Sequence, residues 1–470
     1  MEKIDALGTD TVCAPATAPG GAVSIIRISG PQCLPIVDSL VSFRKGAASE
    51  TPGYRLKRGD FLDIDDVLVG VFRAPRSYTG EDCAEICCHA SPYIISRILE
   101  ELCKAGCRNA APGEFTRRAF LNGKMDLAQA EAVADLIAAS SQAQHKVATS
   151  QLRGGYSALL RDIRSRLLEL STLVELELDF SEEEVEFADR KRLEELLGQA
   201  AGRCRSLAGS FRLGNAIKNG VPVAIVGRPN SGKSTLLNAL LRDDRAIVSD
   251  IPGTTRDTIE ETRVLGGTLF RFIDTAGLRD DAGDEIERLG IGRSLDKIRE
   301  ASIVIAVVDI ASEGPRQPLA GLGEISSRID PLNQKLIIAL NKTDLPTAAE
   351  RLAATVLSEG GQDAALQCAP MIALSAKNGT GLDRLEEALI AAADTGSYGD
   401  ILVTNQRHAS ALAASADALD AALGALRRGL PADLLAEDLR AAISTLGTIT
   451  GEISTDEVLG EIFKGFCIGK

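Results

Sequence analysis

A phosphate-binding loop in the middle of the chain constrains its fold more than any other feature. Residues 227–234 read Gly-Arg-Pro-Asn-Ser-Gly-Lys-Ser, which matches the pattern Gly-x-x-x-x-Gly-Lys-Ser/Thr. The apolar run 221–226 predicts a strand before the loop, and a helix is expected after it. In this context backbone N–H groups converge on nucleotide phosphates at the N-terminus of a helix. We therefore expect an α/β nucleotide-binding domain, preceded by more than two hundred residues.

Three shorter motifs indicate that the nucleotide is a guanine nucleotide. Each follows one of the further strands expected at 269–273, 303–308, 335–340 and 371–374. Asp274-Thr-Ala-Gly277 offers a carboxylate to a metal ion and an amide to the γ-phosphate. Asn341-Lys-Thr-Asp344 offers a carboxylate to the N1–H and amine of guanine, which adenine lacks. Ser375-Ala-Lys377 can place a backbone amide on the guanine O6.

These motifs define a predicted GTP site. Lys233 reaches the β- and γ-phosphates, and Ser234 and Thr255 can bind Mg²⁺. The predicted contacts to GTP are Asn230, Ser231, Gly232, Lys233, Ser234, Thr235, Thr255, Asp274, Gly277, Asn341, Lys342, Asp344, Ser375, Ala376 and Lys377.

The residue that orients the attacking water in many GTPases is replaced here. Leu278 stands where those enzymes carry glutamine, and a leucine side chain cannot orient water. Asn230 and the segment 249–257 gather amide and hydroxyl oxygens near the phosphates, and such oxygens are hard ligands for a large monovalent cation. We expect a cation to do the electrostatic work of an arginine finger.

Length and charge limit the classes of function. A chain of 470 residues can form two to four domains. The net charge of −14 argues against a surface that coats nucleic acid broadly, but not against a local patch. The sequence contains no run of eighteen apolar residues, so no membrane span is predicted. The first residues lack the features of a signal peptide. A cytoplasmic protein is the simplest expectation.

Ten cysteines raise the alternative of a zinc site, because five of them lie between residues 83 and 107, near His89. Their spacing is not that of a Cys-x-x-Cys pair, and Cys87 and Cys88 would point to opposite faces of a strand. Small buried hydrophobic side chains are the better account of these residues.

The regions around the nucleotide motifs have different patterns. Residues up to about 118 read as α+β, with strands at 23–28 and 67–72 and a helix at 93–102. Apolar residues then recur three and four apart, which predicts long helices, including one over 190–211. The apolar stripes of two further helices are Leu160, Ile163, Leu167, Leu170 and Val174, and Leu435, Leu439, Ala442 and Leu446.

This pattern predicts a discontinuous helical domain that is interrupted by an inserted, Ras-like P-loop GTPase domain. The predicted boundaries are 1–120 for the α+β domain, 121–218 and 393–470 for the two parts of the helical domain, and 219–392 for the inserted domain. The end of the chain, Phe466-Cys467-Ile468-Gly469-Lys470, is too apolar for a free tail, so we expect it to dock. Cys467 could be a nucleophile, a redox thiol or a buried side chain.

Together these features resemble one family, the tRNA modification GTPases called MnmE or TrmE. The most specific segments are the loop 227–234, Gly253-Thr-Thr-Arg-Asp257, Asp274-Thr-Ala-Gly-Leu-Arg279 and the terminal Cys467-Ile-Gly-Lys470. Further agreement lies at residues 10–17, 27–30, 78–82, 112–115 and 126–132, so the resemblance spans essentially the full length.

The resemblance implies a GTP hydrolase that acts with an FAD-dependent partner, called MnmG or GidA, in a heterotetrameric or larger complex. The complex would use a one-carbon unit from tetrahydrofolate to install an aminomethyl or carboxymethylaminomethyl group at carbon 5 of the tRNA wobble uridine. It also implies a homodimer that pairs through a folate-binding N-terminal domain, without a membrane. Arg27, Glu85, Lys124 and Lys470 would bind 5-formyltetrahydrofolate or 5,10-methylenetetrahydrofolate.

In this family GTP hydrolysis depends on K⁺. The resemblance implies K⁺ ligands at Asn230, Ser249, Ile251 and Thr254, and Mg²⁺ ligands at Ser234 and Thr255, which adds Ser249 and Thr254 to the GTP site. Glu287 would orient the attacking water, although an extra residue after Gly277 leaves Glu285 as an alternative. Lys233 and Cys467 are the other catalytic candidates.

One departure from the family and two alternative functions bear on these expectations. Cys87-Cys88-His89-Ala90 stands where a glycine-rich stretch is expected, which could alter the wall of the folate pocket. The first alternative is a ribosome-assembly GTPase that binds ribosomal RNA without modification chemistry; its relatives share the loop and Leu278 but usually carry an RNA-binding appendage. The second is a structural dimer whose folate site has degenerated.

Overall fold

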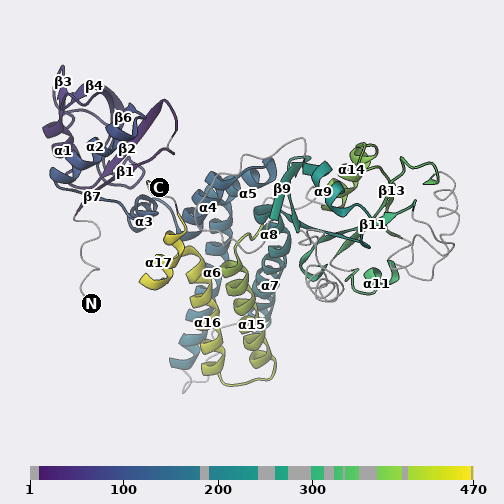
Figure 1. Cartoon of the computed structure of the whole chain (residues 1–470). Coiled ribbons are helices and arrows are strands. Elements are labelled where there is room, and N and C mark those ends of the chain that lie inside the picture. Colours follow the sequence, from purple (N-terminus) through teal and green to yellow (C-terminus); the bar gives the residue numbers. More distant parts are fainter. Residues whose placement is uncertain are drawn as a thin grey trace. The chain divides into compact units, whose positions relative to one another are not determined.

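The computed structural model describes residues 10–18, 20–179, 190–241, 260–273, 298–311, 322–331, 334–348, 368–393, 401–466 and 469 (Figure 1). The chain divides into two compact units, both discontinuous in sequence. The first comprises Met1–Ala134, Gln151–Gly202 and Ala411–Lys470, and the second comprises Asp135–Ser150 and Arg203–Ser410.

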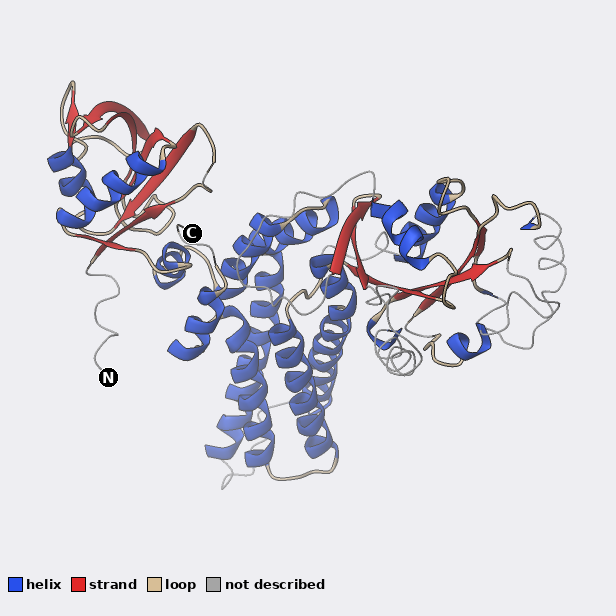
Figure 2. Cartoon of the chain, viewed as in Figure 1, coloured by secondary structure: helices blue, strands red, loops and turns tan. Residues whose placement is uncertain are grey.

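A seven-stranded sheet forms the centre of the N-terminal part of the first unit (Figure 2). Its strands are β1 (Thr11–Pro15), β2 (Val23–Ser29), β3 (Val41–Phe43), β4 (Arg55–Phe61), β5 (Asp65–Phe72), β6 (Cys83–His89) and β7 (Cys107–Asn109). Their order is β3-β4-β5-β6-β2-β1-β7, with β1 and β7 parallel and the other neighbours antiparallel. The helices of this part are α1 (Cys33–Leu40) and α2 (Pro92–Lys104).

Alternation along β2 explains which face of this sheet is covered. Ile26 and Ile28 are fully buried in one apolar cluster with Ile98 and Leu102 of α2. Burying each such side chain is worth about 1.5–3 kcal/mol. Arg27 lies between these two residues and therefore points to the opposite face, where it is paired in register with Glu85 of β6.

Long helices follow this sheet in the chain and return near its end. They are α3 (Glu114–Leu121), α4 (Leu127–Ala138), α5 (Gln142–Leu152), α6 (Gly155–Asp179), α7 (Arg190–Gly209), α8 (Phe211–Asn219), α15 (Gln406–Arg427), α16 (Ala432–Thr450) and α17 (Asp456–Lys464). In the first unit α6 and α16 pack along each other. Both apolar stripes predicted from the sequence are buried on these two helices, which confirms them.

The end of the chain docks on the first unit, as predicted. Phe463 and Phe466 are buried and form one cluster with Leu127 and Ala130 of α4. Gly113 precedes α3 in a left-handed conformation (φ 67°), and a Cβ there would lie 2.9 Å from the carbonyl oxygen of Phe463. A side chain at Gly113 would therefore push the C-terminal helix away.

One helix in the described part of the chain, α15, is long and apolar enough to cross a membrane. Its residues Leu412 and Leu419 are fully buried, and the Ser415 hydroxyl donates to the carbonyl oxygens of Ala411 (2.8 Å) and of Ala442 in α16 (3.4 Å). These contacts are those of a core helix in a helical bundle.

The α/β part of the second unit contains a six-stranded sheet. Its strands are β8 (Val221–Val226), β9 (Glu260–Leu265), β10 (Thr268–Ile273), β11 (Ile303–Asp309), β12 (Lys335–Asn341) and β13 (Met371–Ala373). The order is β13-β12-β11-β8-β10-β9, parallel except for β9 at the edge. One face packs on α9 (Lys233–Leu241) and α14 (Leu382–Ala393), and the other packs on α11 (Leu322–Ser326).

The segments that enter and leave this α/β part run side by side. The backbone N–H of Val403 donates to the Ser210 hydroxyl oxygen (3.1 Å). Gly214 of α8 lies so close to the same segment that a Cβ there would collide with the carbonyl oxygen of Val403. The fold class predicted from the sequence, with α+β, helical and inserted α/β parts, is therefore confirmed.

Candidate functional sites

The phosphate loop connects β8 to α9 at the carboxyl edge of the parallel strands, where α/β proteins bind ligands. Gly227 and Gly232 have positive φ angles of 156° and 95°. A Cβ on Gly227 would collide with the carbonyl oxygen of Val307, and one on Gly232 would collide with the side-chain amide of Asn341. Both positions therefore require glycine, because the loop lies against the ends of two neighbouring strands.

Asn341 joins the phosphate loop to the predicted guanine loop. Its side-chain amide donates to the carbonyl oxygen of Ser231 (2.8 Å), and its side-chain oxygen accepts from the backbone N–H of Ala376 (3.0 Å). Asn341 is 2% exposed. Three of the predicted motifs are thus brought together, and this asparagine fixes the spacing between the phosphate and base ends of the site.

Asp344 is placed to accept hydrogen bonds from a base. The Ser375 hydroxyl donates to its carboxylate (2.7 Å), and this bond lowers the pKa of Asp344 below its ordinary value. Lys342, in the left-handed region (φ 69°), is turned away and pairs with Asp309 at the end of β11 (2.7 Å). The structure thus leaves an ionised, exposed carboxylate at the position expected to select guanine.

The phosphate end of the site offers donors and hydroxyls. The Lys233 ammonium donates to the carbonyl oxygens of Gly227 and Arg228, both at 3.0 Å. Ser234 and Thr235 lie in the first turn of α9, and Asn230 is exposed in the left-handed region (φ 59°). The Ser231 hydroxyl is buried without a hydrogen-bond partner among the described residues, so it can serve a ligand.

Several predicted site residues lie outside the described residues. They are Ser249, Ile251, Thr254, Thr255, Asp274, Gly277, Glu285, Glu287, Cys467 and Lys470. Leu278 also falls in this group.

A second candidate site lies on the face of the N-terminal sheet that α1 and α2 do not cover. The Arg27 guanidinium contacts one carboxylate oxygen of Glu85 through Nε (2.9 Å) and Nη2 (2.8 Å). It also lies over the rings of Tyr78 (5.4 Å) and Phe115 (5.7 Å), and its Nη1 donates to the carbonyl oxygen of Gly469 (3.3 Å). Arg27 therefore contacts a carboxylate, two aromatic rings and a residue at the end of the chain.

Lys124, the third predicted folate residue, contacts the loop that carries Tyr78. Its ammonium donates to the carbonyl oxygen of Pro75 (2.9 Å), and the neighbouring Asn122 amide donates to that of Thr79 (2.8 Å). The structure thus joins Arg27 directly to Glu85, and it joins Lys124 to the loop that carries Tyr78. The roles of Tyr78 and Phe115 were not predicted, although both lie in motifs that carry the family resemblance.

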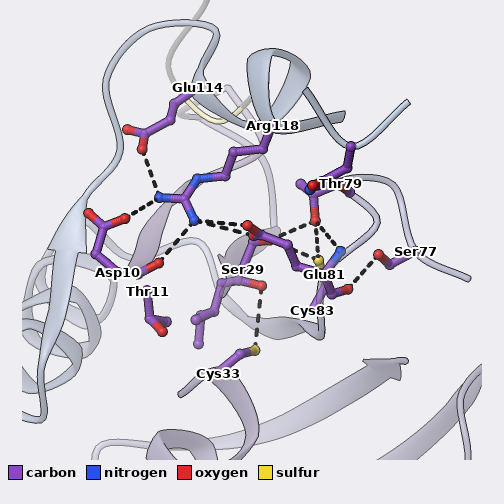
Figure 3. A network of polar contacts seen from close by, with 12 residues as sticks. Asp10, Thr11, Ser29, Cys33, Ser77, Thr79, Glu81, Cys83, Glu114 and Arg118 are labelled. Carbon is purple, nitrogen blue, oxygen red and sulfur yellow. Dashed lines mark hydrogen bonds and ion pairs between the residues drawn. The ribbon is translucent and has the colours of Figure 1, made fainter. Parts of the chain in front are cut away.

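A buried ionic network fixes this loop (Figure 3). Arg118 of α3, 2% exposed, donates to Asp10 (2.7 Å), Glu114 (3.0 Å) and Glu81 (3.2 Å). The Ser29 hydroxyl adds a bond to Glu81 (2.6 Å). One arginine therefore joins the start of β1, the 77–82 loop and α3, a role that the sequence did not reveal.

The pKa shifts of Glu114, Asp10 and Arg118 all favour the charged forms of these groups. Burial opposes ionisation of Glu114, but hydrogen bonds from Arg108, from the Ala111 backbone and from Arg118 lower its pKa below the ordinary value. Burial likewise opposes the charge of Asp10, but hydrogen bonds from Arg108 and Arg118 lower its pKa below the ordinary value. Burial also opposes the charge of Arg118, but its pKa is raised because the attraction of Glu81 and its other carboxylate partners outweighs burial.

Of the five cysteines between residues 83 and 107, Cys83, Cys88 and Cys107 are buried, as expected for small hydrophobic side chains. Cys88 is buried in the core, while Cys87 lies on the opposite face, beside Glu85, as predicted for successive strand residues. Burial, followed by the charge of Glu85, raises the pKa of Cys87. Among the described residues no group of three His, Cys, Asp or Glu side chains could hold a metal ion, so the zinc alternative finds no support there.

Comparisons with known proteins cover the whole chain. A family model described as "GTP-binding protein TrmE N-terminus" matches residues 11–124, and one described as "MnmE helical domain" matches residues 127–467. The chain is 48% identical over 474 residues to the tRNA modification GTPase MnmE of Bacteroides thetaiotaomicron, covering 99% of this chain and 100% of the relative. It is 49% identical over 483 residues to that of Porphyromonas gingivalis, covering 100% of both chains.

Solved structures are similar over a smaller part of the chain. Era in complex with MgGDPNP and nucleotides 1506–1542 of 16S ribosomal RNA is 26% identical over 42% of this chain and 66% of that chain, with a TM-score of 0.29.

Proposed function

Since the chain belongs to the tRNA modification GTPase MnmE family, we propose that it hydrolyses GTP in the modification of the wobble uridine of tRNA. The observation that carries this proposal is the sequence identity of 48–49% to tRNA modification GTPases MnmE over their full length. The meeting of the phosphate loop, Asn341 and Ala376 at one edge of the sheet supports GTP as the nucleotide.

The described residues have distinct roles toward GTP in this proposal. Asp344, oriented by Ser375, accepts from the guanine N1–H and amine. Lys233 exchanges its bonds to loop carbonyls for bonds to the β- and γ-phosphates, and the buried Ser231 hydroxyl can donate to a phosphate oxygen. Mg²⁺ would be held by Ser234, at the start of α9, together with Thr255.

K⁺ would take the place of an arginine finger, held by Asn230, Ser249, Ile251 and Thr254. The exposed side chain of Asn230 supports this role, because it leaves an amide oxygen available beside the phosphates. Glu287, with Glu285 as the alternative, would orient the attacking water. GTP turnover should be faster in K⁺ than in Na⁺, and the Asn230→Ala variant should lose the difference. Equal turnover of the unmodified protein in the two salts would refute the cation site.

The N-terminal site would bind tetrahydrofolate, as its 5-formyl or 5,10-methylene form, through Arg27 and Glu85 with Lys124 and Lys470. When bound, the folate supplies the one-carbon unit. Glu85 would accept from the amidine-like edge of the pterin, and the positive groups would bind its oxygens and glutamate tail. The half-buried Arg27–Glu85 pair fits this ligand, because it presents one acceptor and several donors on the sheet face opposite α1 and α2.

The remaining assignments follow the same proposal. The N-terminal domain, 1–120, would pair two copies of the chain; exposed Leu56 and Leu68 on the sheet face opposite α1 and α2 support an apolar contact there. The helical domain would span 121–218 and 393–470, with Cys467 close to the chemistry, and the GTPase domain 219–392. The FAD-dependent MnmG-like partner would complete the enzyme in the cytoplasm.

The folate assignment is tested by titrating the protein with 5-formyltetrahydrofolate. Arg27→Ala and Glu85→Ala should each weaken binding by at least about tenfold, the loss expected for a charge-assisted bond. Arg97→Ala and Glu100→Ala are matched controls, because they break an exposed ion pair on α2, against the other face of the sheet. Unchanged affinity in both site variants would favour a degenerate site in a structural dimer.

The function itself is tested by nucleoside analysis of bulk tRNA from a strain that lacks the gene. Wobble-uridine modification should disappear and return when the gene is restored. Normal tRNA nucleosides together with accumulated ribosomal precursors would instead favour a ribosome-assembly GTPase.

A further inference from the structure

The second unit contains a cavity of about 610 Å³ at the edge of its sheet opposite the nucleotide loops. Pro222 lies at the start of β8, Ser302 directly precedes β11 and Gln334 directly precedes β12, so the cavity opens at the amino ends of the parallel strands. The backbone N–H of Ser302 donates to the carbonyl oxygen of Pro222 (2.9 Å), which fixes this rim. Four residues of β8, 223–226, separate Pro222 from the phosphate loop, roughly 16 Å of strand.

Four arginines from four different segments line this cavity. They are Arg212 of α8, Arg271 of β10, Arg299 ahead of β11 and Arg328 after α11. Two carboxylates, Glu300 and Asp330, line it as well, so the described lining residues carry a charge of about +2 in a chain whose net charge is −14. Since the arginines come from separate segments, the cluster is made by the fold and is not a run of charge along one helix.

The cavity also has an apolar wall. Phe211 and Ala216 come from α8, together with Arg212 and Asn215, and Pro222 comes from the sheet. The lining therefore combines guanidinium donors, carboxylate acceptors and an aromatic ring in a volume within the range of small-ligand sites.

We propose that this cavity binds a nucleotide of the tRNA backbone, with its phosphate on the arginines. The inference rests on the proposed function, which makes tRNA the substrate. Guanidinium forks match phosphate oxygens in pairs, an aromatic ring can stack on a base, and the carboxylates can accept from the ribose 2′-hydroxyl. An acidic protein segment fits less well, because it brings few hydroxyl groups to the carboxylates of Glu300 and Asp330.

This assignment explains how an acidic protein can hold RNA. The overall field of the chain repels a polyanion, so contact is confined to a place where arginines outnumber carboxylates. The cavity is remote from the phosphate loop, so tRNA and GTP can be bound by the same unit at the same time.

The test measures binding of a fluorescently labelled tRNA transcript to the full-length protein with GDP present, over a series of KCl concentrations. The triple variant Arg212→Gln, Arg299→Gln, Arg328→Gln should bind at least about tenfold more weakly, and the slope of log K against log salt should fall by about 0.7–0.9 for each phosphate that the variant no longer neutralises. Arg384→Gln, which removes one positive charge at an exposed site on α14, should leave both quantities unchanged and is the control for each single arginine variant.

GTP hydrolysis without tRNA reports whether the variants fold, since none of the changed residues belongs to the nucleotide site. If the triple variant loses it, the single variants Arg212→Gln and Arg328→Gln, whose side chains are exposed, are measured instead. Arg328→Lys should keep most of the salt dependence but lose affinity, because it keeps the charge and removes the fork.

Unchanged tRNA affinity and salt slope in the arginine variants, with normal binding by the unmodified protein, would overturn the inference and leave the proposed function standing. Arginine-dependent binding of free AMP, without an effect on tRNA, would assign the cavity to a mononucleotide and also overturn it. The inference would also be overturned if the arginine variants bound tRNA normally and lost only their binding to the FAD-dependent partner. Normal wobble-uridine modification in the strain that lacks the gene would instead refute the proposed function itself.

Discussion

The nucleotide site and the N-terminal site differ in how their parts are brought together. The nucleotide site consists of short motifs, each at the end of a strand, and Asn341 joins two of them across 110 positions of sequence. In the N-terminal site single residues meet: Arg27 contacts Glu85, 58 positions away, and Gly469, 442 positions away. The first site can be read from local sequence, whereas the second exists only in the folded chain.

The two sites also differ in how their charges are satisfied. Asp344 is exposed and accepts from the Ser375 hydroxyl, so most of its hydrogen-bonding capacity is available to a ligand. Arg27 and the nearby Arg118 network are already paired with carboxylates. The N-terminal charges therefore serve the stability of the domain as well as binding, and mutations in the two sites should have different consequences.

The largest effect is expected from breaking the buried network. Arg118→Met leaves Asp10, Glu81 and Glu114 without their shared counterion, which should cost about 3–5 kcal/mol of local stability. Hydrogen exchange of β1 and α3 in the full-length protein measures this cost. Arg97→Met, at an exposed pair on α2, should change it by less than about 0.5 kcal/mol. Equal protection in the two variants would show that the network does not stabilise the domain.

A smaller effect, on binding alone, is expected at the guanine end of the nucleotide site. Asp344→Asn replaces an acceptor by an amide that also donates, so GTP should bind about a hundredfold more weakly, or about 2.7 kcal/mol. XTP, which offers a carbonyl in place of the amine, should bind better than GTP. Calorimetric titration of both nucleotides measures the change. Ser375→Ala should weaken GTP binding by only about tenfold, because it removes one orienting bond.

The aromatic contacts of Arg27 should matter less. Tyr78→Leu removes a ring that lies 5.4 Å from the guanidinium and should weaken 5-formyltetrahydrofolate about fivefold, in line with a cation–π contact of about 1 kcal/mol. Tyr78→Phe keeps the ring and should bind like the unmodified protein. If both variants bind equally weakly, the bond between Tyr78 and the Thr116 hydroxyl, and not the ring, positions Arg27.

The smallest effect is expected from acid. Burial opposes ionisation of Asp10 and Glu114, but hydrogen bonds from Arg108 and Arg118 bring their pKa values below the ordinary 3.8 and 4.5. A lowered folded-state pKa gives stability that is present above the ordinary value and is lost as pH falls through the folded value. Exchange protection of α3 should therefore be constant from neutral pH to about pH 5 and decrease below it. Arg118→Met should flatten this decrease, and an unaltered pH profile in that variant would contradict the assignment.

Much of the fold was predictable because buried strands and long helices leave strong patterns. The strands β8, β10, β11, β12 and β13 are apolar runs and were predicted nearly to their ends. The edge strand β9 was missed, because Glu260, Glu261 and Arg263 interrupt its apolar pattern. The helix expected over 190–211 ends at Gly209, and a separate helix, α8, follows Ser210.

The sites were predictable only where a motif is local. Asn341, Asp344 and Ser375 could be assigned from their own sequence neighbours, although the bond from Asn341 to Ser231 could not. Tyr78 and Arg118 act through partners on other strands and helices, so their roles depend on the register of β1, β2 and β6. No local pattern in a single sequence predicts the register of these strands.

The adjacency of Ser210 and Val403 has a consequence for how the gene can be rearranged. Because the chain enters and leaves the α/β part through two hydrogen-bonded neighbours, removing that part leaves two ends that already lie close together. A deletion that joins residue 209 to residue 404 through a short glycine linker should therefore give a smaller protein that still folds. The same junction would accept an unrelated domain, so the nucleotide-binding part can be exchanged as a module even though it is encoded within the rest.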